Sequence, residues 1–284
     1  MARLRTYASF VRVSHSVFAL PFALVGSLLA ARTSPMTWAR VGWIIGCMVT
    51  ARSAAMAFNR VVDAAYDARN PRTAMRELPR GRMTRLEAML FVIGSATLFI
   101  FCAWRISTLC LVLAPVALAI VFWYSWAKRV TSYTQFFLGV AMAVAPVGGW
   151  LAAGGRGGVT PWLLALAIGT WVGGFDILYA CQDLEVDRRE GLRSIPVRFG
   201  IPRSLVLSRA THVVTIVCLA ALGGVASLGP IYFAGVCGVA VLLAWEQSLV
   251  SATDLSQVKR AFDLNGWVGL LYLLTTAADI YWRS

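Results

Sequence analysis

Long apolar stretches recur along the whole of this chain and constrain its fold more than any other feature. Of the 284 residues, 59% are hydrophobic and only 14% are charged, which is too apolar for an average soluble domain. A helix needs about 20 apolar residues to cross a hydrocarbon core, and the alternation typical of strands is absent. We therefore predict an all-α membrane protein with a single domain, residues 1–284. Nine transmembrane helices are predicted, at 14–32, 38–59, 86–104, 107–126, 135–154, 161–181, 205–224, 229–250 and 265–282.

Basic residues are distributed unevenly between the predicted loops. Lys and Arg on the side of the N-terminus outnumber those on the opposite side by roughly four to one. The positive-inside rule therefore places the N-terminus in the cytoplasm and, after nine spans, the C-terminus outside. The same rule accounts for the net charge of +13. We predict an integral protein of the cytoplasmic (inner) membrane, with membrane lipid and no nucleic acid as a partner.

Cysteine and histidine usage narrows the chemistry further. The six cysteines are scattered through apolar segments, no C-x-x-C occurs, and there are only two histidines. A zinc site and a disulfide framework are both disfavoured by this pattern.

The acidic residues that are placed to do chemistry fall in two short runs. Asp63 and Asp67 follow Asn59 at the end of the second span, and Asp183 and Asp187 follow the sixth span. In each run the carboxylates are four residues apart, which puts them on one face of a helix. The runs are 120 residues apart, and each precedes a basic, proline-containing loop. We predict a two-fold repeat of four-helix units around a central cavity, with both runs on the cytoplasmic side.

Clustered carboxylates at a membrane boundary need a compensating cation. They repel one another and are costly to desolvate, and hard oxygen ligands favour Mg²⁺, which typically bridges carboxylates to substrate phosphates. Arginines flank both runs, and arginine with Mg²⁺ suits a diphosphate. These arginines are Arg69, Arg72 and Arg76 after the first run and Arg188, Arg189 and Arg193 after the second.

A simpler interpretation of the acidic runs is that they are solvated. A charge after a helix is usually solvated, and one D-x-x-x-D alone is unremarkable, whereas two at corresponding places favour a site. Four other acids lack such an arrangement, and we predict that they are surface charges: Glu77, Glu87, Glu190 and Asp254.

The two runs, N-x-x-x-D-x-x-x-D and D-x-x-x-D, resemble the aspartate-rich motifs of the UbiA superfamily of intramembrane prenyltransferases. The resemblance covers essentially the whole chain. Flanking residues that agree are Arg72-Thr73, Arg76, Leu78-Pro79, Gly81, Tyr124-Ser125-Trp126-Ala127-Lys128-Arg129, Thr131, Gln135, Tyr179, Gly191 and Arg193-Ser194.

Two segments, 14–23 and 174–183, resemble the 4-hydroxybenzoate polyprenyltransferase-like branch. They are most similar to members that act in menaquinone synthesis by the futalosine route, where the acceptor is a carboxylated dihydroxynaphthalene. One departure is Arg60, because ubiquinone-type members often carry an Asp directly after the Asn. That difference removes one carboxylate and leaves the number of metal ions open.

The resemblance implies Mg²⁺-dependent transfer of a polyprenyl group from polyprenyl diphosphate to a hydroxylated aromatic carboxylic acid. The acceptor would be 4-hydroxybenzoate or 1,4-dihydroxy-6-naphthoate, in quinone biosynthesis. Metal ligands would be Asn59, Asp63, Asp67, Asp183 and Asp187, the carboxylates also being catalytic. Cations for the diphosphate would be Arg72, Arg76, Lys128, Arg129 and Arg193. Tyr179, in register with Asp183, would orient the diphosphate or stabilise an allylic cation through its ring.

Two further residues are candidates for substrate binding. Arg52 is the Lys or Arg that lies deepest inside a predicted span, seven residues before Asn59 and so two turns deeper. An intramembrane charge is a functional hypothesis by default, and the expected partner is the carboxylate of the acceptor. His15 shares the local resemblance, but a lone histidine is also common as a core residue with one hydrogen bond, and both interpretations stay open.

Other membrane proteins share some of these sequence features. A transporter would also show repeats and basic loops, but its charged site would lie at the midplane rather than at one face. CDP-alcohol phosphotransferases also pair aspartates with metal, but their D-G-x-x-A-R element is missing. Haem O and chlorophyll synthases remain alternatives within the superfamily.

Overall fold

The structure, a computed structural model, describes residues 7, 9–11 and 19–282, which are mostly helical and include no strand. The predicted all-α class is therefore confirmed. The chain forms two compact units, Met1–Ser16 with Trp38–Trp126, and Val17–Thr37 with Ala127–Ser284.

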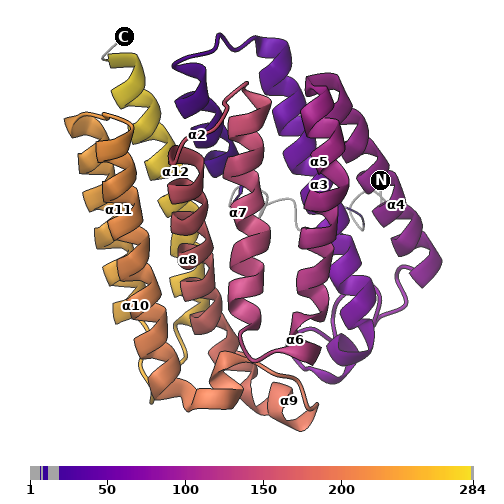
Figure 1. Cartoon of the computed structure of the whole chain (residues 1–284). Helices are drawn as coiled ribbons and strands as arrows, with labels where there is room; N and C mark the ends of the chain where they lie inside the picture. The colour runs from indigo at the N-terminus through magenta and orange to yellow at the C-terminus, as the bar shows by residue number, and fades with distance from the viewer. Residues whose placement is uncertain (1–6, 8, 12–18, 283–284) are drawn as a thin grey trace. The chain divides into compact units, whose positions relative to one another are not determined.

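The first unit is built from three long helices. They are α3 (Trp38–Arg69), α4 (Arg85–Ile106) and α5 (Thr108–Trp123), followed by the short 3₁₀ helix η2 (Tyr124–Trp126). Every pair among α3, α4 and α5 is in contact, as Figure 1 shows. α4 begins at a capping box in which Thr84 and Glu87 satisfy each other's backbone N–H groups. The length of α3 matters most, because it carries the first acidic run beyond the apolar segment.

The second unit is larger and has α8 at its centre. α8 contacts α2, α7, α10 and α12, and α11 packs on α10 and α12; in Figure 1 these helices run side by side. Its buried core includes Trp171 and Phe175 of α8, Tyr232 and Tyr272. The elements are α2 (Leu20–Ala31), α6 (Ala127–Val130), α7 (Thr134–Ala152), α8 (Thr160–Ala180), η3 (Cys181–Asp183), α9 (Leu184–Arg189), α10 (Ile195–Val225), α11 (Pro230–Ser248) and α12 (Val258–Trp282).

Small residues allow the helices of the second unit to approach closely. A Cβ added at Gly139 of α7 would lie 2.2 Å from the carbonyl oxygen of Gly169 in α8. A Cβ at Gly149 would lie 2.0 Å from the carbonyl oxygen of Ala23 in α2, and Ser27 donates a hydrogen bond to the Gly149 carbonyl at 3.0 Å. Close backbone contact of this kind is typical of helix packing in membranes, where lipid gives no hydrophobic drive for association.

Seven of the described helices are long and apolar enough to span a membrane. They coincide with the predicted spans from 38–59 to 229–250. α2 is a shorter apolar helix of 12 residues, and α12 has 25 residues but does not reach the same hydropathy. The membrane class is therefore confirmed, while the count of nine stays a prediction.

The compact units do not coincide with sequential halves of the chain. α2 precedes α3 in sequence but packs on α7, α8 and α12 of the second unit.

α10 bends at Gly200, whose φ of 74° is a left-handed conformation, shortly before Pro202. The predicted four-helix repeat and single domain stay predictions.

Candidate active site

The first acidic run lies on α3, as predicted. Because α3 continues to Arg69, Asn59, Asp63 and Asp67 follow one another at four-residue intervals on a continuous helix. The Asn59 side chain donates from Nδ2 to Asp63 Oδ2 at 3.1 Å. This bond orients the Asp63 carboxylate along the helix face.

Asp67 is buried, and it is bound by the loop that follows α3. Arg76 Nη1 donates to both Asp67 oxygens, at 2.8 and 2.7 Å. Thr73 Oγ1 donates to the Asp67 carbonyl at 3.0 Å, and the Arg72 backbone N–H donates to Asn70 Oδ1 at 2.9 Å. The Arg72 side chain is exposed. The structure thus brings Arg76 to the first run and leaves Arg72 on the outside of the same loop.

The second acidic run differs from the prediction of one continuous helix. α8 ends at Ala180, a 3₁₀ turn covers Cys181–Asp183, and α9 begins at Leu184. A 3₁₀ turn has about 3.0 residues per turn rather than 3.6, so Asp183 and Asp187 do not follow the register of α8. Both carboxylates are nevertheless buried, and Lys128 Nζ lies 3.8 Å from Asp187 Oδ1.

Arg193 also has a structural task. Its backbone N–H donates to the Lys128 carbonyl at 2.8 Å, and its Nη1 donates to the Val130 carbonyl at 2.6 Å. These bonds tie the loop after α9 to α6, next to Lys128 and the half-buried Arg129. The Tyr179 ring packs at 4.8 Å from the ring of Phe262.

The two remaining substrate-binding candidates have different outcomes. Arg52 lies on α3 and is partly buried, and its Nε is buried with no hydrogen-bond acceptor among the described residues. Arg52 thus has a buried donor inside a predicted span, and its role in substrate binding stays a prediction. His15 lies outside the described residues.

Of the four acids predicted to be surface charges, Glu77 is not one. It is buried and paired with Arg60 at 2.7 Å. Glu87 serves the capping box of α4, and Glu190 lies 3.7 Å from Arg189. Asp254 is exposed, and the backbone N–H of Ser256 at 2.9 Å holds the pKa of its carboxyl below the usual value.

Sequence reasoning missed two buried acids inside the second unit. Glu246 of α11 accepts from Asn265 Nδ2 at 3.0 Å, and Asn265 Oδ1 accepts from Trp171 Nε1 at 2.7 Å. Asp279 of α12 accepts from the backbone N–H groups of Gly229, at 2.6 Å, and Tyr232, at 3.3 Å. It therefore caps the N-terminus of α11 from a neighbouring helix. The signal that could have identified Glu246 and Asp279 is a charged residue inside an apolar segment.

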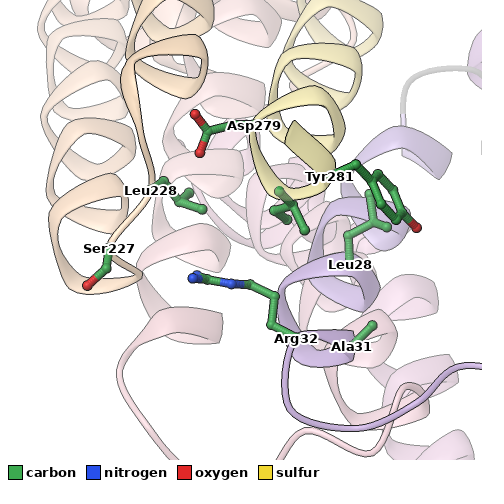
Figure 2. A pocket seen from close by; sticks show the side chains of 8 residues that line it. Leu28, Ala31, Arg32, Ser227, Leu228, Asp279 and Tyr281 are labelled. Atoms are coloured by element: carbon green, nitrogen blue, oxygen red, sulfur yellow. The ribbon is translucent and has the colours of Figure 1, made fainter. Parts of the chain in front are cut away.

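A cavity of about 530 Å³ lies beside Asp279, at the C-terminal end of α12. Figure 2 shows Arg32 reaching across it below Asp279, with Ser227 on the other side. Arg32 donates to the Ala226 carbonyl, so both charges bind backbone groups. Ala261, near the start of α12, packs in the same apolar cluster as Cys181 of η3. From Ala261 to Asp279 the helix rises by about 27 Å over 18 residues. The cavity is therefore far from the second acidic run.

The oxygen atoms of the two acidic runs are the candidate ligands for Mg²⁺. Within the part of the chain that the structure describes, no three His, Cys, Asp or Glu side chains gather within reach of one ion. Each run offers two carboxylates, and Asn59 adds an amide oxygen. Mg²⁺ usually takes only one or two protein carboxylates and completes its shell with water and substrate phosphate. The residues present fit Mg²⁺ that binds together with a phosphate-bearing ligand.

Comparison with known proteins identifies the family. The pattern of the UbiA prenyltransferase family matches residues 19–272. A 4-hydroxybenzoate octaprenyltransferase of Marinobacter nauticus is 31% identical, over 98% of this chain and 96% of that protein.

Two solved structures share the fold. A UbiA homolog from Aeropyrum pernix K1 is 32% identical, with a TM-score of 0.86 over 94% of this chain and 98% of that one. A UbiA homolog from Archaeoglobus fulgidus bound to GPP and Mg²⁺ has a TM-score of 0.75 at 18% identity, over 97% and 99% of the two chains. The chain described here belongs to the UbiA prenyltransferase family and is an enzyme of that family.

Proposed function

We propose that this protein transfers a polyprenyl group from polyprenyl diphosphate to a hydroxylated aromatic carboxylic acid, in the biosynthesis of a quinone. The observation that carries the proposal is that buried carboxylates lie beside cations at the ends of two apolar helices, Asp67 with Arg76 and Asp187 with Lys128. The Marinobacter relative, named for 4-hydroxybenzoate and an octaprenyl group, supports an aromatic acceptor and a long isoprenoid donor.

We propose that both acidic runs act on the diphosphate of the donor through Mg²⁺. Asn59, Asp63 and Asp67 would hold the ion from the first run, and Asp183 and Asp187 from the second. When bound, Mg²⁺ neutralises the diphosphate and stabilises the charge that develops on it as it departs. The Archaeoglobus homolog was solved with GPP and Mg²⁺, which supports the same pairing of ligands here.

The reaction is a substitution at the allylic carbon of the donor. The C–O bond breaks, its electron pair leaves with the diphosphate, and the ring carbon ortho to the acceptor hydroxyl forms the new C–C bond. A base then removes the ring proton and aromaticity returns. Arg76, 2.7 Å from Asp67, and Lys128, 3.8 Å from Asp187, would stabilise the departing diphosphate by charge. Arg72, Arg129 and Arg193 would add to that charge.

The protein must also protect the allylic cation. The Tyr179 side chain lies one turn before Asp183, on the apolar helix α8, where its ring can stabilise a neighbouring positive charge. The apolar spans exclude water, which would otherwise capture the cation and yield the free alcohol.

We propose that Arg52 binds the carboxylate of the acceptor. Its Nε is a buried donor with no hydrogen-bond acceptor among the described residues. A buried donor without an acceptor inside a membrane is costly, and a substrate carboxylate would supply the acceptor. The resemblance of segments 14–23 and 174–183 favours 1,4-dihydroxy-6-naphthoate over 4-hydroxybenzoate as the acceptor, and so a role in menaquinone rather than ubiquinone synthesis.

We also propose that the enzyme lies in the cytoplasmic membrane with its N-terminus and both acidic runs on the cytoplasmic side. The distribution of Lys and Arg supports this orientation. Membrane lipid surrounds the spans and supplies the donor laterally.

The test is transfer of a radiolabelled polyprenyl group by the purified full-length protein in detergent or nanodiscs. 4-Hydroxybenzoate and 1,4-dihydroxy-6-naphthoate are supplied in parallel, each with Mg²⁺ or with a chelator. We expect Mg²⁺-dependent product with the naphthoate and less with the benzoate. Product with neither acid would overturn the proposed function, and equal or greater product with the benzoate would overturn the acceptor assignment.

A further inference from the structure

Two ion pairs of opposite polarity join α3 to the loop that follows it. Arg76 of the loop binds Asp67 of the helix, and the next loop residue, Glu77, binds Arg60 of the helix at 2.7 Å. Arg60 and Asp67 are seven residues apart, so they lie almost in line on α3, about two turns from one another. The adjacent loop residues Arg76 and Glu77 therefore bind the same face of α3 at two positions, Asp67 and Arg60, about two turns apart.

The Arg60–Glu77 pair is the more deeply buried of the two. Arg60 is 6% and Glu77 8% exposed. The second Glu77 oxygen, Oε1, accepts from Ser9 Oγ at 2.6 Å, so both oxygens are used. The Arg60 guanidinium also lies 5.5 Å from the centre of the Phe10 ring. A buried pair with further bonds on each partner has a defined geometry.

The pair is neutral as a whole, and this separates it from the binding chemistry. Arg60 is compensated by Glu77, so we assign it no part in binding diphosphate, and we assign Glu77 no part in binding metal. What the pair does supply is a fixed backbone at residue 77. The Arg82 backbone N–H donates to the Glu77 carbonyl at 2.9 Å, and that of Arg80 donates to the Arg76 carbonyl at 3.1 Å. The turn that carries Arg76 is thus anchored through its neighbour.

We infer that Arg60 and Glu77 are positioning residues for the donor site. Their buried ion pair holds the loop of residues 70–83 on α3, so that Arg76 meets Asp67 and Arg72 is presented on the same loop. This inference rests on the proposed function, because it assigns the loop to diphosphate and Mg²⁺. It also explains how Arg60 can stand beside Asn59 without opposing the metal.

The experiment compares full-length wild type with Glu77→Gln, Arg60→Gln and the double variant. Three quantities are measured: the Tm, the increase in Tm caused by Mg²⁺ with inorganic pyrophosphate, and the KM values for donor and acceptor. A single substitution leaves one buried charge without its partner, so we expect a lower Tm. The double variant removes both charges, and we expect its Tm to return most of the way to that of wild type.

In the double variant, we expect the Tm and the donor KM to respond differently. We expect its donor KM to stay raised by about tenfold, and its Tm increase with Mg²⁺ and pyrophosphate to stay reduced, because the loop has lost its anchor. The acceptor KM should change less than about twofold. A matched control is Asp263→Asn, which removes an exposed carboxylate 4.0 Å from Lys259 in α12 and should leave all three quantities unchanged.

The contrary results are distinct. A double variant whose donor KM and ligand-induced Tm increase equal those of wild type would overturn the inference, since the pair would then serve stability alone. Equal increases in donor and acceptor KM would also overturn it. Wild type that shows the Tm increase but transfers no prenyl group would instead count against the proposed function, and the Tm increases of the variants would still decide the role of the pair.

Discussion

Arg72 and Arg76 lie four residues apart on one loop, yet their surroundings differ. Arg76 donates from Nη1 to both oxygens of Asp67, whereas the Arg72 side chain is exposed and its backbone N–H donates to Asn70. Arg76 therefore orients the Asp67 carboxylate in addition to its proposed interaction with the diphosphate, whereas Arg72 lies on the exposed side of the loop. At the scale of single residues, similar motif positions therefore have different tasks.

Arg52 gives a prediction at this scale. Arg52→Ala should raise the KM for the aromatic acid by about tenfold or more, because the carboxylate loses a charged hydrogen bond of about 1.5–3 kcal/mol. The donor KM should change much less. Steady-state kinetics with each substrate varied in turn provide the measurement, and Arg105→Ala, which removes a cation stacked on Trp43 at 5.4 Å, is the control. A larger effect on the donor than on the acceptor would remove Arg52 from the acceptor pocket.

Residue types and spacing single out Asn59, Asp63, Asp67, Asp183 and Asp187 as candidates, but they do not separate buried from exposed charges. Glu77 looked like a surface charge because its partner, Arg60, lies 17 residues away, too far for any helical spacing rule. Its burial depends on how the loop folds back on α3. Such a pairing is invisible to local pattern analysis.

At the scale of elements, α11 depends on a cap that its own sequence does not supply. Gly229 has no side chain to bind the first N–H groups, and Asp279 of α12 does so instead. Asp279→Ala should therefore lower the free energy of unfolding by about 2–3 kcal/mol. Asp263→Ala, in the same helix but exposed, should change it by less than about 0.5 kcal/mol. Denaturation in detergent measures both, and equal losses would contradict the capping role.

The contact between α2 and α7 gives a second prediction for elements. A Cβ at Gly149 would lie 2.0 Å from the Ala23 carbonyl oxygen, whereas a Cβ at the adjacent Gly148 meets nothing within 4 Å. Gly149→Ala should destabilise the protein by about 1–3 kcal/mol through overpacking. Gly148→Ala should be neutral or stabilise it by up to about 1 kcal/mol, since alanine favours the helix. Thermal unfolding of the two variants should thus shift in different directions, and a similar shift in both would refute the close contact.

Element positions were predictable where apolar length decides them, and less so where backbone geometry does. The continuation of α3 through the first run followed from its spacing. The 3₁₀ turn at Cys181–Asp183 did not, because segment 180–190 contains no Gly or Pro to mark a break. A D-x-x-x-D spacing fits either backbone, so the two runs looked alike until their helices were resolved.

At the scale of the whole molecule, membership of one unit or the other does not follow chain order. α2, a helix of 12 residues, precedes α3 in the chain but packs in the second unit. Hydropathy located this segment without indicating its neighbours, which are selected by small residues such as Gly26 and Gly149. Likewise, α12 is less apolar than the seven spanning helices, and it carries Lys259, Arg260 and Asp263 near its start and Asp279 near its end.

We propose that both acidic runs are essential for Mg²⁺-dependent prenyl transfer. This role can be tested by measuring transfer of radiolabel by Asp67→Ala and Asp183→Ala, each verified as folded. Glu185→Ala serves as the control, because its side chain lies in the second run but is 82% exposed. We expect a loss of more than about a hundredfold in kcat for each aspartate variant and near wild-type turnover for the control. Full activity in both aspartate variants would contradict it.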